Sequence, residues 1–60
     1  MTYYEKHAET YKKANRKEKC EIKKHWLDAH AKNVKRGDEE MMEFTARFVA
    51  QIAVIDAGLI

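Results

Sequence analysis

The last third of the chain, residues 44–60, is a helix-forming segment that is apolar around most of its circumference. At helical spacing, one apolar stripe recurs every three or four residues and consists of Met41, Phe44, Phe48, Ile52, Ile55 and Leu59. A second stripe lies beside it and consists of Met42, Ala46, Val49, Ala53, Ala57 and Ile60. One neighbouring helix covers one stripe, so the sequence predicts a helix that packs against several partners.

The chain has 60 residues, which is near the lower limit for a domain that folds alone. A domain of this size buries only about 60% of its unfolded surface and usually needs a disulfide, a metal or oligomerisation. The single cysteine, Cys20, cannot form an internal disulfide and is typical of a reducing cytoplasm. Oligomerisation or a protein partner therefore remains as the expected source of stability, and we expect no cofactor.

The apolar content of the two ends of the chain indicates whether it carries a signal peptide or a membrane-spanning helix. The N-terminal residues have no apolar run, so the sequence predicts no signal peptide. The C-terminal apolar segment carries Arg47, Gln51 and Asp56, whereas a spanning helix needs about 20 mostly uncharged residues. We therefore expect no membrane span and a cytoplasmic location.

Helix signals divide the chain into two predicted helices within one domain of residues 1–60. The chain has no proline, and its two glycines are Gly37 and Gly58. Thr2 and Glu5 have the spacing of a capping box at a helix N-terminus. Gly37 suits the residue after a helix, and Asp38 suits the N-cap of the next one. The sequence thus predicts helices over about 3–36 and 39–57, with a turn at 37–38.

Two arrangements follow from the unequal lengths of these helices. The first helix would run about 50 Å and the second about 28 Å, so the first overhangs the second. The overhang carries Tyr3, Tyr4 and Tyr11, which a solvated helix end rarely exposes. We predict an all-α helical hairpin that pairs with a second hairpin into a four-helix bundle, and this pairing covers the three tyrosines. The alternative is a compact three-helix monomer, in which the first helix breaks near residues 15–19.

Helical spacing also assigns apolar residues to a predicted core and a predicted interface. The predicted core consists of Ile22, Leu27, Met41, Phe44, Phe48, Ile52, Ile55 and Leu59. The predicted protein interface consists of Tyr3, Tyr4, Tyr11, Trp26, Val49, Ala53 and Ile60. Asp56 lies on the apolar side of the second helix, where an unpaired carboxylate is costly. It therefore sits at an edge, pairs with a cation of another chain, or is exposed near a frayed end.

Charge is distributed unevenly along the chain. Residues 1–37 hold eleven Lys and Arg against five acids, whereas residues 38–60 hold one Arg against five acids. On a continuous first helix, one row of cations would share a face: Lys12, Arg16, Lys19 and Lys23. Such a row is a possible contact for a nucleic-acid backbone, without base readout. It is equally the pattern of a solvated outer helix face.

The histidines and the cysteine could bind a metal or act in catalysis, but they lack the spacing that places metal ligands on one face of a helix. His25 lies five residues from both Cys20 and His30, whereas helical metal ligands lie three or four residues apart. No loop is long enough to build a catalytic pocket around a Cys–His pair. We therefore expect no metal site, no catalytic residue and no enzyme activity.

The sequence favours a small non-enzymatic protein that binds another protein. Its size, its unbalanced apolar helix and its tyrosines suit the kind of regulator or inhibitor that a phage or plasmid encodes. One alternative is a helical bundle that binds RNA or DNA through the basic face of the first helix. A second alternative is a structural subunit of a larger assembly.

Overall fold

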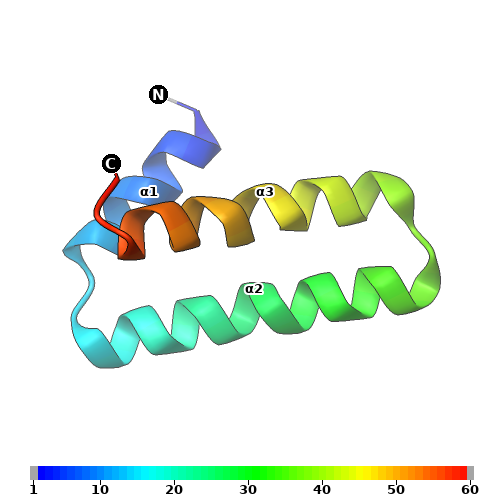
Figure 1. The fold of residues 1–60 in the computed structure, drawn as a ribbon, viewed down its shortest axis with the longest axis horizontal. Coiled ribbons are helices and arrows are strands. Elements are labelled where there is room, and N and C mark those ends of the chain that lie inside the picture. Colours follow the sequence, from blue (N-terminus) through cyan, green and yellow to red (C-terminus); the bar gives the residue numbers. More distant parts are fainter. Residues whose placement is uncertain (1, 60) are drawn as a thin grey trace.

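The computed structural model describes residues 2–59, and within them the chain forms three helices and no strands. The helices are α1 (Tyr3–Lys13), α2 (Arg16–Arg36) and α3 (Glu39–Asp56). Figure 1 shows α2 and α3 side by side and antiparallel, with α1 folded back at the end far from their connecting turn. The alternative of a compact three-helix chain fits this structure, and pairing into a four-helix bundle finds no support in it.

The prediction of one continuous helix over residues 3–36 is wrong, because the chain turns at Ala14 and Asn15. Ala14 leaves the helical region with φ −67° and ψ 148°. Asn15 then caps α2: its side chain accepts a hydrogen bond from the Glu18 amide at 2.9 Å, and the Glu18 carboxylate accepts one from the Asn15 amide at 3.3 Å. This reciprocal capping box satisfies amides that the interrupted helix leaves free.

The turn between α2 and α3 lies at the predicted residues. Gly37 has φ 71°, in the left-handed region that glycine enters without steric cost. The Asp38 side chain accepts a hydrogen bond from the Met41 amide at 3.2 Å and so begins α3. The acidic residues Glu39 and Glu40 follow in the first turn of α3, where they complement the helix dipole.

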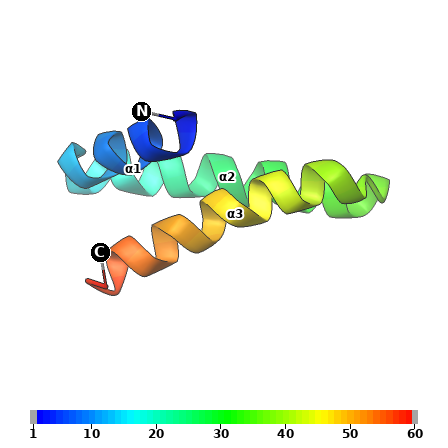
Figure 2. The same ribbon diagram turned by 90° about the horizontal axis from the view of Figure 1, so that it is seen from above.

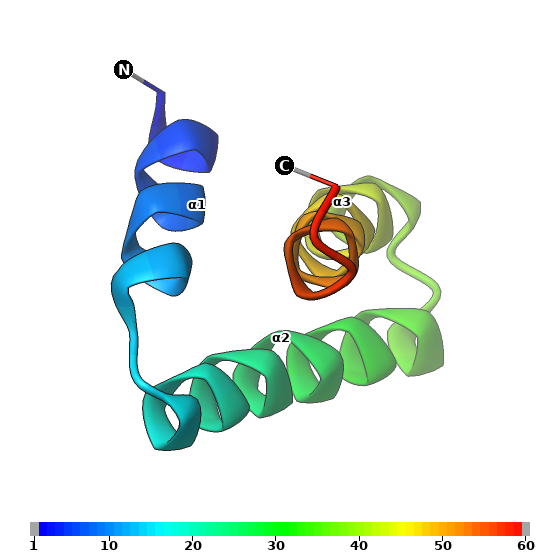
Figure 3. The same cartoon turned by 60° about the vertical axis from the view of Figure 1, so that its left-hand side comes forward.

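Figure 2 shows the axes of α2 and α3 diverging with distance from the turn, and α1 lying over the wider end. In Figure 3, α1 and α3 both lie on the same side of α2. Each helix contributes to the core that fills the space between them. The buried apolar residues are Tyr11 from α1, Trp26 from α2, and Phe48 and Ile52 from α3. Ile22, Val49 and Ile55 pack against this cluster while remaining partly exposed.

Half of the predicted core residues are exposed rather than buried. Phe48 and Ile52 are buried, and Ile22 and Ile55 are half-buried against them. The prediction is wrong for the other four, which are Leu27, Met41, Phe44 and Leu59. For the first three, the reason is the position of α1, which covers only the part of the α2–α3 pair far from the turn. Met41 and Phe44 near the turn, and Leu27 on the other side of the pair, are not covered by α1. Leu59 is exposed for a different reason, because it lies beyond the end of α3 at Asp56.

Candidate interaction surfaces

A chain of hydrogen bonds attaches α1 to the other two helices. The Trp26 indole N–H donates to His7 Nε2 at 2.8 Å, so the proton of the neutral His7 ring is on Nδ1. That Nδ1–H donates to Gln51 Oε1 at 2.7 Å, and Gln51 Nε2 donates to the Tyr4 carbonyl at 2.9 Å. Gln51 is buried, so this network satisfies an amide that would otherwise be costly to enclose.

A second connection joins all three helices at the far end of α3. The Tyr11 hydroxyl donates to Asp56 Oδ1 at 2.8 Å, and Lys23 Nζ lies 2.6 Å from Asp56 Oδ2. Hydrogen bonds from Lys23 and then from Tyr11 lower the pKa of Asp56 below its ordinary value. Asp56 therefore pairs with a cation of its own chain, and the expected pairing with another chain's cation is not needed to explain it.

The same contact affects Tyr11, whose side chain is only 1% exposed. Burial first, and then the hydrogen bond to Asp56, raise the pKa of Tyr11 from 10.0 to about 12. The buried phenol holds its proton because its ionised form would lose hydration and lie beside a carboxylate.

We expect the free energy of unfolding to fall between about pH 10 and pH 12 because of Tyr11. The unfolded chain loses this proton near pH 10, whereas the folded chain keeps it until about pH 12, so unfolding releases a proton in this window. Tyr11→Phe has no such proton, and its urea-unfolding free energy should fall less steeply over the same window. The same pH dependence in both proteins would contradict this assignment.

A third polar cluster lies between α2 and α3 near the turn. The Thr45 hydroxyl donates to the Met41 carbonyl at 3.0 Å and accepts from His30 Nδ1 at 2.8 Å. Asn33 Nδ2 donates to the Met41 carbonyl at 3.3 Å, and Arg36 donates to Asn33 Oδ1. Asn33 and Thr45 are both buried, and among residues 2–59 no buried side-chain nitrogen or oxygen lacks a partner. This cluster fixes α2 against α3 where no third helix supports them.

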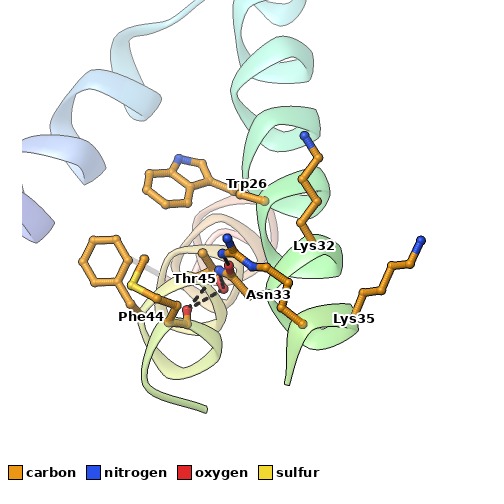
Figure 4. Close-up of a pocket in the computed structure, with 9 residues that line it drawn as sticks. Trp26, Lys32, Asn33, Lys35, Phe44 and Thr45 are labelled. Carbon is orange, nitrogen blue, oxygen red and sulfur yellow. Dashed lines mark hydrogen bonds between the residues drawn. The ribbon is translucent and has the colours of Figure 1, made fainter. Parts of the chain in front are cut away.

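Above this cluster lies an open groove of about 410 Å³, here called the turn-side groove (Figure 4). Its apolar wall is formed by Trp26, Ala29, Met41 and Phe44, and its polar floor by Asn33 and Thr45. Three cations of α2 complete the lining: Lys32, Lys35 and Arg36. Figure 4 shows Trp26 and Phe44 extending to the same side of the groove, while Lys32 and Lys35 extend outward from α2.

A second apolar surface lies on the side of the α2–α3 pair turned away from α1. Leu27 is 48% and Val34 52% exposed, and both lie about 80–100° around α2 from Trp26. With Ala31 of the same helix face and with Val49 and Ala53 of α3, they form what is here called the back face. A hollow of about 260 Å³ on this face is lined by Lys23, Leu27, Val49, Ile52, Ala53 and Asp56.

The predicted interface residues separate into three groups. Tyr11 and Trp26 belong to the core of the chain, so their assignment to an interface is wrong. Tyr3 and Tyr4 are exposed, yet each ring also meets the edge or face of Phe48, at 5.6 and 5.5 Å between centroids. Val49 and Ala53 belong to the back face, where Val49 is half-buried and Ala53 is exposed. The prediction for Ile60 falls outside the described residues.

The predicted row of cations is interrupted by the break between α1 and α2. Lys12 is on α1, whereas Arg16, Lys19 and Lys23 are on α2, so the four no longer follow one helix face. Two of them also have partners within the chain. Lys19 lies 5.7 Å from the centroid of the Tyr11 ring, and Lys23 is paired with Asp56. The structure therefore does not provide the continuous basic row that the sequence predicted.

Cys20 is a free, exposed thiol. Among residues 2–59, no three His, Cys, Asp or Glu side chains are grouped so that they could hold a metal ion. None of the helices described for these residues combines the length and apolar character that a membrane crossing requires. Comparisons with protein-family models, with curated proteins and with solved structures found no match for this chain.

Proposed function

We propose that this chain is a small non-enzymatic module that binds other proteins through the two apolar surfaces of the α2–α3 pair. Such a module acts by occupying a surface of its partner, as the small regulators and inhibitors of phages and plasmids do. The observation that carries the proposal is the exposure of large apolar side chains on both sides of the pair, namely Leu27 and Val34 on one and Met41 and Phe44 on the other.

The arrangement of these residues supports binding more than their number does. Single apolar residues scattered over a surface are normal, whereas contiguous patches mark interaction sites. Leu27 and Val34 lie two turns apart on one helix face, and each apolar surface contains a hollow. A helix face that is apolar, hollowed and built on rigid helices suits a protein partner.

A second copy of the chain is the first partner that we propose for the back face. A two-fold contact would place Leu27 and Val34 of both copies against each other, so that one apolar surface covers itself. The proposed dimer differs from the predicted bundle, because α1 packs within its own chain and covers the opposite side of α3. Binding of a nucleic-acid backbone is the competing function, since α2 still carries Arg16, Lys17 and Lys24 on exposed positions.

Sedimentation equilibrium with surface variants tests the proposal. We expect Leu27→Ser combined with Val34→Ser to shift the chain toward a monomer of 7.1 kDa, because the apolar contact is lost. The matched control is Glu21→Ser combined with Asp28→Ser, which changes two exposed side chains of the same helix, also two turns apart, that lie about 100–140° around α2 from Leu27 and Val34 and should leave the mass unchanged. An equal shift in both double variants would contradict a role for the back face.

A further inference from the structure

We infer that the turn-side groove binds one amphipathic helix of a partner protein, with an apolar face toward Phe44 and an acidic flank toward α2. This inference rests on the proposed function and specifies the chemistry of the partner at one of its two surfaces.

The first argument comes from the way in which the chain already uses this surface. α1 packs as a helix over the far half of the α2–α3 pair, where it contacts Trp26 and Phe48. The turn-side groove is the next part of the same side of the pair, and it also contains Trp26. Figure 1 shows that α1 ends before it reaches this part. A second helix can therefore occupy the position that α1 leaves open.

The second argument is the apolar character of the groove. Phe44 is 44% and Met41 40% exposed, and the ring of Phe44 lies 6.1 Å from that of Trp26. Ala29 also lines the groove, and its side chain is a single methyl group that takes up little of the space. Grooves of this kind accept a helix through apolar residues spaced three, four and seven positions apart. From Trp26 to Arg36 the groove follows α2 for about 15 Å, which matches roughly three turns of a bound helix.

The third argument is the charge around the groove, which selects an acidic partner and its orientation. All three cations of the lining come from α2, and the lining contains no acidic residue. Within residues 2–59, neither Lys32 nor Lys35 takes part in an ion pair, so both are free to meet carboxylates. On α3, Glu40 lies one turn before Phe44 and Arg47 one turn after it, so that side of the groove carries no excess of positive charge. An acidic flank is therefore stabilised most where it faces the three cations of α2.

The test uses a synthetic helical peptide of about 14 residues with leucines at the spacing of one helix face and glutamates along one flank. A second peptide has lysine in place of each glutamate. Calorimetric titration of the full chain should give at least about tenfold tighter binding of the glutamate peptide, and the ratio should shrink as salt rises. Fluorescence of Trp26, the only tryptophan, should change on binding because its ring lines the groove.

Two helical alanines, one in the groove and one outside both surfaces, provide a pair of variants. Ala29→Glu places a carboxylate in the groove and should weaken binding of the glutamate peptide by about tenfold or more. Ala50→Glu makes the same change at an exposed position of α3 that belongs to neither the groove nor the back face, and it should leave binding unchanged. Circular dichroism establishes that both variants are folded before they are compared.

Three results would overturn the inference. The two peptides could bind equally, the two alanine variants could behave alike, or an oligouridylate of similar charge could displace the peptide, which would indicate a nucleic-acid site. Self-association through the back face is measured separately. If the chain self-associates but the peptide does not bind, the groove inference alone fails; if neither occurs, the proposed function fails as well.

Discussion

Phe48→Ala should leave little folded protein at 25 °C. The Phe48 ring is buried and stacks on Trp26 at 4.4 Å between centroids with 7° between planes, and it also contacts the rings of Tyr3, Tyr4 and His7. Truncating such a side chain typically costs about 3–5 kcal/mol. A domain of this size has a total stability of roughly 3–9 kcal/mol, so the loss is a large part of the whole.

The matched control is Phe44→Ala, which removes the same side chain one turn earlier on α3. Phe44 is 44% exposed, so its truncation should cost much less, about 1 kcal/mol. Thermal unfolding followed by circular dichroism compares the two variants directly. Similar melting temperatures for both would contradict the placement of the core around Phe48.

Trp26→Ala should destabilise the chain by a comparable amount, about 3–5 kcal/mol, and should release α1. Trp26 connects the helices in two ways, since its ring stacks on Phe48 of α3 and its indole N–H donates to His7 of α1. Its loss removes packing from the centre of the core and leaves His7 Nε2 without its donor. Urea unfolding gives the change in free energy, and limited proteolysis after residues 12 and 13 reports the release of α1.

Trp26→Phe separates the two contributions. Phenylalanine keeps an aromatic ring against Phe48 but has no N–H, so the variant should lose about 1–3 kcal/mol from the unpaired nitrogen and the missing ring atoms. A Trp26→Phe variant as unstable as Trp26→Ala would mean that the hydrogen bond to His7 dominates. Wild-type stability in both variants would contradict the position of Trp26 in the core.

The sequence predicted much of α3 because its signals are local and strong. Gly37 and Asp38 specify the turn through backbone conformation and capping, and the three- and four-residue spacing of apolar side chains identifies the helix. Phe48 and Ile52 lie in the middle of the stripe, where any arrangement of neighbouring helices covers them. They were therefore predictable without knowledge of the fold.

A break near residues 15–19 was only the alternative prediction, although a signal for the break at Ala14 and Asn15 was present. Asn15 and Glu18 have the spacing of a capping box, and Asn is among the preferred N-cap residues. Helix propensity alone gives no reason to stop at this point, because no glycine or proline is nearby. The fold-back is favoured by contacts distant in sequence, such as the one between Tyr11 and Asp56.

A hydrophobic pattern also could not predict which polar residues are buried. Asn33, Thr45 and Gln51 are all buried because each has hydrogen-bond partners on another helix. Those partners depend on the angle and register at which the helices pack. Without that angle and register, the apolar pattern placed Met41 and Phe44 in the core. Their stripe extends beyond the part of α3 that α1 covers, and there it forms the wall of the turn-side groove.

Sedimentation equilibrium of the unmodified chain at low and at high salt tests most directly whether it binds proteins through an apolar surface. The proposed function predicts a dimer that dissociates on dilution and persists at 1 M salt, because apolar contacts do not depend on charge screening. Two results together would contradict the proposed function: a single species of 7.1 kDa at every concentration, and binding to heparin with an affinity that falls steeply as salt rises. They would favour a nucleic-acid backbone as the partner.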